Sequence, residues 1–267
     1  MNMRYISFAV VVLSGMIAGA GEPSDVALPS RERFHLFLLV GQSNMAGRGK
    51  LAAQDRDIHP RVLMFTKEDR WVPAVDPIHF DKPNVVGVGL GRTFGTEIAE
   101  ASPEITVGLI PCAVGGSPIA SWEPGGYHES TKSHPYDDAL RRASQAHKSG
   151  VLKAVLWHQG ESDSQPGKAE VYEQKLHKLI VRCRTALAVP GVPFVVGQMG
   201  QFPERPWNDA KKLVDSVQRN LAQKVSQYAF VNSDGLAHKG DQVHFDAKSY
   251  RELGRRYARA YREMTNR

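Results

Sequence analysis

The stretch FHLFLLVGQS, residues 34–43, decides the fold. Its first seven residues are apolar except for His35, and a short apolar run of this kind predicts a buried strand of a parallel sheet. The residues that follow, Gly41, Gln42 and Ser43, predict a tight turn at the carboxyl end of that strand. We therefore expect a strand over residues 34–40 that runs directly into a polar loop.

Further short apolar runs alternate with longer segments of helical period along the rest of the chain. This order is typical of an α/β fold, in which helices cover a parallel sheet. The expected strands cover residues 34–40, 62–65, 105–110, 151–157, 194–199 and 229–232, and the expected helices cover residues 91–101, 136–148, 169–188, 208–226 and 247–264.

The first 20 residues differ from the rest of the chain. Arg4 is followed by the uncharged run Tyr5–Ile17 and then by the small residues 18–20, which is the order of a secretory signal peptide. The run has 13 residues, whereas a membrane-spanning helix needs roughly 20, so we expect no stable membrane insertion. The expected organisation is a signal peptide at 1–20, a polar linker at 21–33 and one domain at 34–267, exported to the periplasm or out of the cell.

The composition is that of a globular protein. The chain has 267 residues, of which 42% are hydrophobic and 23% charged, and a formal net charge of +6. Basic pairs such as Arg141-Arg142 fall in expected helices, where a solvated face explains them, so we expect no nucleic-acid partner. Cys112 and Cys183 belong to no zinc-binding pattern, although export would permit a disulfide between them. The sequence predicts no particular oligomeric state.

Three expected strands, over residues 34–40, 105–110 and 151–157, end in polar loops that contain glycine. In an open parallel sheet such loops converge at one edge, which is where ligands bind. We therefore expect the three loops to contribute to one site.

The first loop belongs to the segment VGQSNMAG, residues 40–47. Its Ser43 resembles the serine of a nucleophile elbow, although Met45 replaces the second glycine of G-x-S-x-G. Taken alone, a serine at this place is also typical of a helix cap or a turn. A phosphate-binding loop is excluded because Leu51, instead of Ser or Thr, follows Gly49-Lys50.

The second and third loops carry hydrogen-bond donors and a carboxylate. The paired glycines of PCAVGGSPI, residues 111–119, either bring a backbone N–H to an oxyanion or simply form a turn. In WHQGESD, residues 157–163, Gln159 can donate to an oxyanion and Glu161 can orient a histidine. Capping of the next helix explains the last two residues of that segment equally well.

A fourth segment, DQVHF at residues 241–245, precedes the last expected helix. Asp241 stands three residues before His244, so it can reach one ring nitrogen and leave the other free to accept a proton. A metal site is the alternative, but no further ligand motif accompanies this pair. We expect neither a metal nor another cofactor.

The motifs GQSNMAG, VGGSPIASW, WHQGESD and DQVHF together resemble the SGNH hydrolase superfamily. Within it they resemble the sialate O-acetylesterase-like domain, which includes acetylxylan esterases of carbohydrate esterase family 6. The resemblance implies a three-layer α/β/α sandwich with a central, mainly parallel sheet of the flavodoxin-like kind. It also implies a serine-dependent enzyme that releases acetate from an acetylated carbohydrate, of the acetylxylan or the sialate type.

The resemblance also implies roles for single residues. Ser43 is the implied nucleophile and His244 the implied base. The implied oxyanion donors are the backbone N–H groups of Ser43 and Gly116 and the side chain of Gln159. The acid partner of His244 has two candidates, because similar proteins use either the Asp of D-x-x-H or the Glu of HQGE; these are Asp241, favoured by its local reach, and Glu161.

Carbohydrate is favoured over lipid because the loops carry aromatic and imidazole side chains among polar residues instead of a long apolar lid. These side chains are Trp122, Tyr127, His128 and His158. We expect substrate contacts from Gln42, Asn44, Trp122 and His158, although a tryptophan at a sheet edge is equally typical of the core. Two alternatives remain open: another exported SGNH serine esterase, acting on aryl or lipid esters or on O-acetylated peptidoglycan, and a non-catalytic carbohydrate-binding module.

Overall fold

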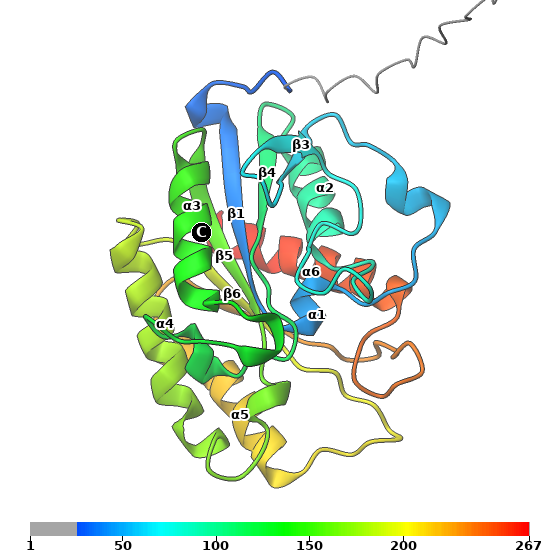
Figure 1. Cartoon of the computed structure of the whole chain (residues 1–267), viewed down its shortest axis with the longest axis vertical. Helices are drawn as coiled ribbons and strands as arrows, with labels where there is room; N and C mark the ends of the chain where they lie inside the picture. The colour runs from blue at the N-terminus through cyan, green and yellow to red at the C-terminus, as the bar shows by residue number, and fades with distance from the viewer. Residues whose placement is uncertain (1–25, 267) are drawn as a thin grey trace, which may run out of the picture.

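The computed structural model describes residues 26–266. They form three layers, with a central sheet between two layers of helices (Figure 1). The sheet has seven strands in the order β3-β2-β4-β1-β5-β6-β7. Only β2 and β3 pair antiparallel, and all other neighbours are parallel. The strands are β1 Phe34–Gly41, β2 Val62–Phe65, β3 Trp71–Pro73, β4 Thr106–Pro111, β5 Val151–His158, β6 Phe194–Gly197 and β7 Tyr228–Val231. The predicted α/β fold is confirmed, and β3 is an edge strand that the sequence pattern did not reveal.

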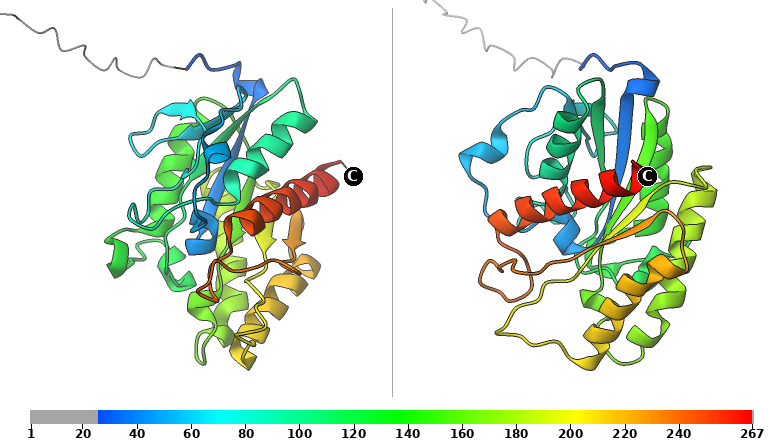
Figure 2. Two further views of the ribbon diagram at one scale, coloured as in Figure 1. Left: turned by 90° about the vertical axis from the view of Figure 1, so that its right-hand side faces the viewer. Right: turned by 180° about the vertical axis from the view of Figure 1, so that it is seen from behind.

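Helices cover both faces of the sheet. Side chains of α3, α4 and α5 pack in the hydrophobic cluster on one face, and those of α2 and α6 pack on the other, where α6 crosses the sheet (Figure 2). The helices are α1 Ser43–Ala46, α2 Gly91–Ala101, α3 Pro135–His147, α4 Tyr172–Ala186, α5 Asp209–Asn220 and α6 Ala247–Thr265. Short 3-10 turns are η1 Arg31–Arg33, η2 Ala53–Arg56, η3 Ile119–Trp122, η4 Glu129–Thr131, η5 Glu161–Asp163, η6 Ala169–Val171 and η7 Leu221–Gln223.

Strand β1 is the centre of the core because it lies between β4 and β5 and is buried on both faces. Leu36 and Leu38 pack on the side of α3 and α4, whereas Phe37 and Leu39 pack on the side of α2 and α6. All four side chains are fully buried, and burying each contributes about 1.5–3 kcal/mol. This is the physical reason why the apolar run at 34–40 determines the strand that positions the site.

The carboxyl ends of β1, β4 and β5 meet at one edge, as the sequence predicts. Leu39 pairs with Pro111, and Gly41 pairs with His158. Gly41 has a φ of +130°, and a Cβ atom there would lie 2.2 Å from the carbonyl oxygen of His158. Only glycine therefore fits at this position, where the chain leaves the sheet and enters α1.

The expected signal peptide at residues 1–20 lies outside the described residues. Within residues 26–266, no helix is both long and apolar enough to cross a membrane. Cys112 and Cys183 are buried as free thiols, without a disulfide between them.

Candidate active site

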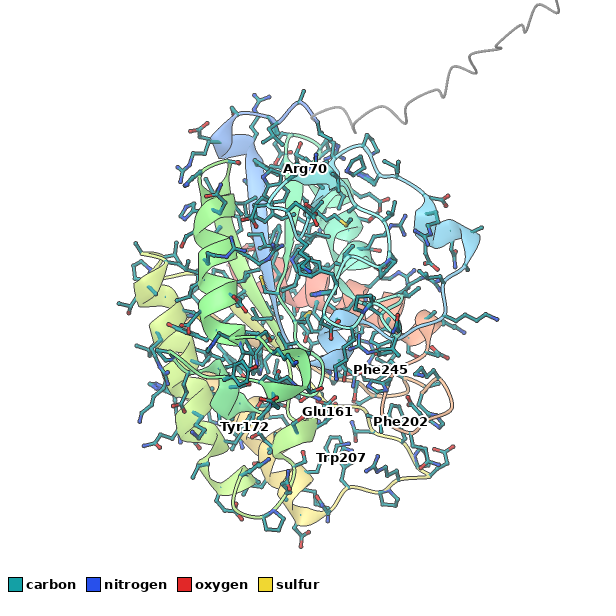
Figure 3. The ribbon with its side chains drawn as sticks, viewed as in Figure 1. Arg70, Glu161, Tyr172, Phe202, Trp207 and Phe245 are labelled. Atoms are coloured by element: carbon teal, nitrogen blue, oxygen red, sulfur yellow. The ribbon has the colours of Figure 1, made fainter. Side chains whose placement is uncertain are left out.

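A pocket of about 630 Å³ lies over the carboxyl edge of the sheet. Figure 3 shows Glu161 and Phe245 near this edge, with Arg70 at the opposite end of the molecule. Ser43, Gly116 and Glu161 line the pocket together with Asp241 and His244. Four segments that are far apart in the sequence therefore share one site.

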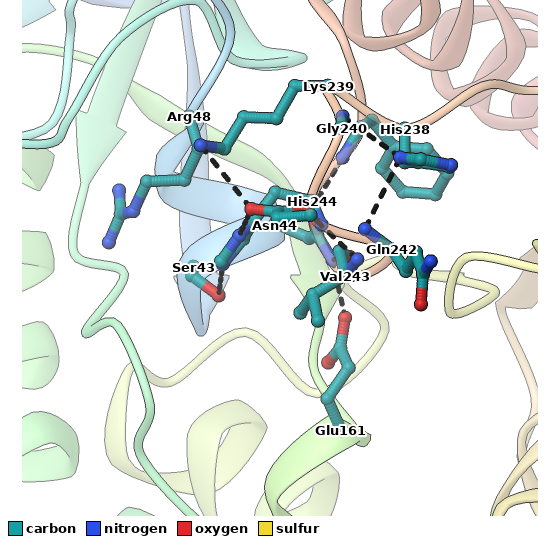
Figure 4. Close-up of polar contacts among 12 residues, drawn as sticks. Ser43, Asn44, Arg48, Glu161, His238, Lys239, Gly240, Gln242, Val243 and His244 are labelled. Atoms are coloured by element: carbon teal, nitrogen blue, oxygen red, sulfur yellow. Dashed lines mark hydrogen bonds and ion pairs between the residues drawn. The ribbon is translucent and has the colours of Figure 1, made fainter. Parts of the chain in front are cut away.

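Ser43, His244 and Asp241 form a continuous line of hydrogen bonds. Figure 4 shows Ser43 beside His244. Ser43 Oγ lies 3.0 Å from His244 Nε2, and His244 Nδ1 lies 2.7 Å from Asp241 Oδ2. Ser43 begins α1, and the other two residues belong to the loop between β7 and α6. A hydroxyl, an imidazole and a carboxylate in this order are the arrangement of an activated nucleophile, its base and the group that orients the base.

The carboxylate of Asp241 is held by its own loop. Its Oδ1 atom accepts hydrogen bonds from the backbone N–H groups of Val243, at 3.0 Å, and His244, at 2.8 Å. Partial burial alone raises the pKa of Asp241, but the hydrogen bonds from the His244 backbone and ring and from Val243 outweigh it and hold that pKa well below its usual value. Asp241 is therefore ionised at neutral pH and can stabilise a positively charged His244 ring.

Two backbone N–H groups at the pocket are free to bind an oxyanion. Ser43 and Gly116 both line the pocket, and among the described residues neither N–H has a hydrogen-bond acceptor. Gly116 has a φ of +85°, which glycine adopts without strain. The loop is fixed by Asp81, whose Oδ2 accepts from the N–H of Gly115 at 2.8 Å and from Arg48 at 2.7 Å.

Residues 33–263 match the family model described as carbohydrate esterase, sialic acid-specific acetylesterase. The chain belongs to this family. A probable carbohydrate esterase of Arabidopsis thaliana is 32% identical over 250 residues, which cover 85% of this chain and 89% of that protein. This protein is therefore a carbohydrate acetylesterase, as the four motifs predict.

Solved structures support the same fold. The crystal structure of the Arabidopsis thaliana protein superposes on this esterase with a TM-score of 0.76 and 30% identity, over 88% of this chain and 99% of that one. The crystal structure of NanS superposes with a TM-score of 0.74 and 16% identity, over 90% of this chain and 99% of that one. The crystal structure of a carbohydrate acetylesterase from Xanthomonas citri superposes with a TM-score of 0.66 and 18% identity, over 88% of this chain and 57% of that one. At these lower identities the last two show the fold alone, which is SGNH-like.

The two carboxylates proposed for His244 have different partners in the esterase. Asp241 contacts the ring. Glu161 instead accepts a hydrogen bond from Asn44 Nδ2 at 2.6 Å, and it has no hydrogen bond or ion pair with His244. The geometry thus favours Asp241 as the partner of the base.

Gln159 does not lie where an oxyanion donor is needed. Its side chain is fully buried, and its Nε2 atom donates to the carboxylate of Asp163 and to the carbonyl oxygen of Ser117. Its Oε1 atom accepts from Tyr172 at 2.9 Å. The structure contradicts the predicted donor role, because the buried carboxylate of Asp163 binds the amide on the interior side of the loop.

Three of the four expected substrate contacts are also corrected. Asn44 and His158 are fully buried, and Trp122 is 2% exposed and packs edge-on against Trp157 in the core. His158 contacts Tyr257 through Nδ1, and its burial lowers its pKa to about 4. Only Gln42 lines the pocket.

The sequence did not predict a group of cations around the pocket. Lys82, Arg205 and Lys211 line it, and none of the three forms an ion pair with a described residue. The Nζ atom of Lys211 lies 5.0 Å from the centre of the Trp207 ring. Arg205 lies in the loop between β6 and α5, and Lys211 lies in the first turn of α5, so their only signal in the sequence is their closeness along the chain. Within residues 26–266, no cluster of three or more His, Cys, Asp or Glu side chains is placed to hold a metal ion.

Proposed function

We propose that the esterase removes acetyl groups from saccharide hydroxyls by acyl transfer through Ser43. Ser43 Oγ attacks the acetyl carbonyl while His244 Nε2 accepts its proton, and the same nitrogen then protonates the sugar oxygen as it leaves. Water, deprotonated by His244, attacks the acetyl-enzyme and releases acetate. The observation that carries this proposal is the hydrogen-bonded line from Ser43 through His244 to Asp241.

The remaining roles follow from the same geometry. The free N–H groups of Ser43 and Gly116 stabilise the oxyanion of each tetrahedral intermediate. Asp241 holds the His244 ring with Nε2 toward Ser43 and stabilises its charged form. The chemistry needs no cofactor.

An acidic saccharide of the sialate type fits the pocket better than a neutral one such as acetylxylan. Lys82, Arg205 and Lys211 line the pocket, and none of them forms an ion pair with a carboxylate of residues 26–266. A substrate carboxylate would supply the partner that these side chains lack. Lipid esters fit poorly, since the apolar side chains of the lining are limited to Val85, Pro206 and Val243.

Export of the chain is part of the proposal. It is supported by the arrangement of Arg4, the uncharged run Tyr5–Ile17 and the small residues that follow. Expression of the full gene with N-terminal sequencing of the recovered protein tests it, and a mature chain that still begins at Met1 would contradict it.

The first test compares wild type with Ser43→Ala on p-nitrophenyl acetate, O-acetylated sialic acid and acetylated xylan. Acetate release by the variant should fall by at least about 10³-fold on each substrate that wild type uses, because the triad acts as a unit. Circular dichroism confirms that both proteins are folded. Equal activity of the variant would mean that Ser43 is not the nucleophile.

The acidic substrate has a matched test on neighbouring residues of α5. Lys211→Gln removes a pocket cation, whereas Lys212→Gln removes one that pairs with Asp209 on the exposed surface. We expect Lys211→Gln to raise KM for O-acetylated sialic acid at least about tenfold and to leave KM for p-nitrophenyl acetate unchanged, because a hydrogen bond to a charged group contributes roughly 1.5–3 kcal/mol. Lys212→Gln should change neither value. Equal effects of Lys211→Gln on both substrates would rule out recognition of a negative charge.

A further inference from the structure

Asn44 follows the nucleophile in α1, and its side chain is fully buried. Figure 4 shows this side chain among its neighbours Val243 and Glu161. Nδ2 donates to the carbonyl oxygen of Val243 at 3.0 Å and to Glu161 Oε1 at 2.6 Å. Oδ1 accepts from the hydroxyl of Tyr250 at 2.6 Å and from the N–H of Phe245 at 3.4 Å. The amide thus uses both of its protons and both acceptor positions.

Two of these partners, Val243 and Phe245, flank His244 in the sequence. A side-chain amide presents a donor and an acceptor in one plane, as a peptide group does, so Asn44 pairs with the carbonyl of Val243 and the N–H of Phe245 much as a neighbouring strand would. Asn44 is one peptide bond from Ser43, whereas Ser43 and His244 are 201 positions apart and share a single hydrogen bond. The amide therefore links the backbone of the nucleophile to the backbone of the base.

We propose that Asn44 is a positioning residue that holds His244 at hydrogen-bonding distance from Ser43. This inference rests on the proposed roles of Ser43 and His244. Asn44 touches no reacting atom, because its side chain is enclosed.

Glu161 acts through the same amide. A carboxylate can only accept a hydrogen bond, so it directs Nδ2 toward itself and leaves Oδ1 facing Tyr250 and Phe245. Glu161 therefore orients the amide that positions the base, and it does not contact the base itself.

The first test is Asn44→Ala with Gln198→Ala as a matched control. Gln198 is also a fully buried amide that bonds a carboxylate, that of Asp215, and a backbone N–H, that of Ser233. Asn44→Ala should lower kcat on p-nitrophenyl acetate by about 10²-fold, since a misplacement of about 1 Å has that cost, and change KM by less than about threefold. Gln198→Ala should lower Tm about as much as Asn44→Ala does, because each removes a buried amide, but it should keep kcat within about twofold of wild type. Equal losses of kcat in both variants, or none in Asn44→Ala, would overturn the inference.

A covalent probe separates failure of this inference from failure of the proposed function. A fluorophosphonate phosphonylates the serine oxygen: the O–P bond forms, the P–F bond breaks, fluoride leaves and His244 takes the serine proton. Mass spectrometry follows the rate. We expect the probe to label wild type at Ser43, and to label Asn44→Ala at the same serine about 10²-fold more slowly. Labelling of both at one rate refutes only the positioning role, and wild type that is not labelled at Ser43 refutes the proposed nucleophile.

Two substitutions of Glu161 give a second test, which stays informative if one of the other variants folds poorly. Glu161→Gln keeps an Oε1 acceptor for Asn44, whereas Glu161→Ala removes it. We expect kcat of Glu161→Gln to exceed that of Glu161→Ala by at least about tenfold, with equal KM values. Equal kcat values in the two variants would show that Glu161 does not act through this hydrogen bond.

Discussion

Asp241 and Glu161 are carboxylates of one pocket, and their hydrogen bonds separate their roles. Asp241 binds the ring of His244 and two backbone N–H groups. Glu161 binds the amide of Asn44. At the scale of the residue, then, function depends on which donor each oxygen meets.

Asp241→Asn tests the first of these roles. At pH 7 we expect kcat to fall by about 10²–10⁴-fold, because the amide cannot stabilise the protonated ring or select its tautomer. The lowered pKa of Asp241 also means that its carboxylate stabilises the folded state above its unfolded pKa of about 4, and this contribution is lost as the pH falls through the folded pKa. The Tm of wild type should therefore exceed that of the variant at pH 7, and the difference should shrink below about pH 4. A difference that stays constant down to pH 2 would contradict this.

Gln159→Ala tests the corrected assignment of this amide. The substitution removes one hydrogen bond from Asp163, which keeps the N–H of Ile119, and one from the hydroxyl of Tyr172, which keeps the backbone carbonyl of residue 159. It should therefore lower the free energy of unfolding by about 1–3 kcal/mol in urea titrations. We expect kcat to fall by less than about tenfold. A loss of 10²–10³-fold with unchanged stability is the signature of an oxyanion donor and would restore the original role.

At the scale of the element, the junction of β1 and α1 determines where the nucleophile stands. Gly41→Ala puts a methyl group against the carbonyl of His158 at a φ of +130°, so we expect more than about 3 kcal/mol of destabilisation and loss of activity. Gly125→Ala is the control, because Gly125 has a φ of +71° with no atom within 4 Å of the added Cβ. It should cost only about 1 kcal/mol. Thermal and urea unfolding measure both, and equal costs would mean that the close approach of β1 to β5 is not a constraint.

At the scale of the whole molecule, the pH dependence of stability should carry the signature of Asp76. Burial raises the pKa of Asp76 to about 7, and the charge of Arg92 and the N–H of Gly89 offset this only in part. Between about pH 4 and pH 7 the folded state holds a proton that the unfolded state has lost. Asp76 therefore stabilises the fold fully below about pH 4, and this stability is lost as the pH rises through about 7.

Asp76→Asn should flatten this dependence. From pH 5 to pH 8 the free energy of unfolding of wild type should fall relative to that of the variant by a few kcal/mol, given about 1.4 kcal/mol for each unit of pKa. Urea titrations at four pH values measure the difference. Parallel curves for the two proteins would mean that Asp76 is ionised in the folded state at neutral pH.

The fold was largely predictable because its signals are local. The apolar run at 34–40 and the helical period of 247–264 depend on which faces are buried, and the structure places β1 and α6 close to those bounds. The pairing of Asp241 with His244 was also predictable, since the two residues are three positions apart. The short strand β3, Trp71–Pro73, was not predicted, because a strand of this length has no periodic sequence pattern and forms only by pairing with β2.

The direction of several site side chains was decided only by the tertiary structure. The sequence by itself determined that Ser43, Gln159 and His244 follow strands or precede a helix at one edge of a parallel sheet. It did not determine that Gln159 turns inward to Asp163, or that Asn44 bonds the backbone around a histidine 200 positions away. A side-chain amide hydrogen bonds to whichever donors and acceptors the folded chain brings within reach, and those partners come from segments whose distance along the sequence carries no information about their distance in space.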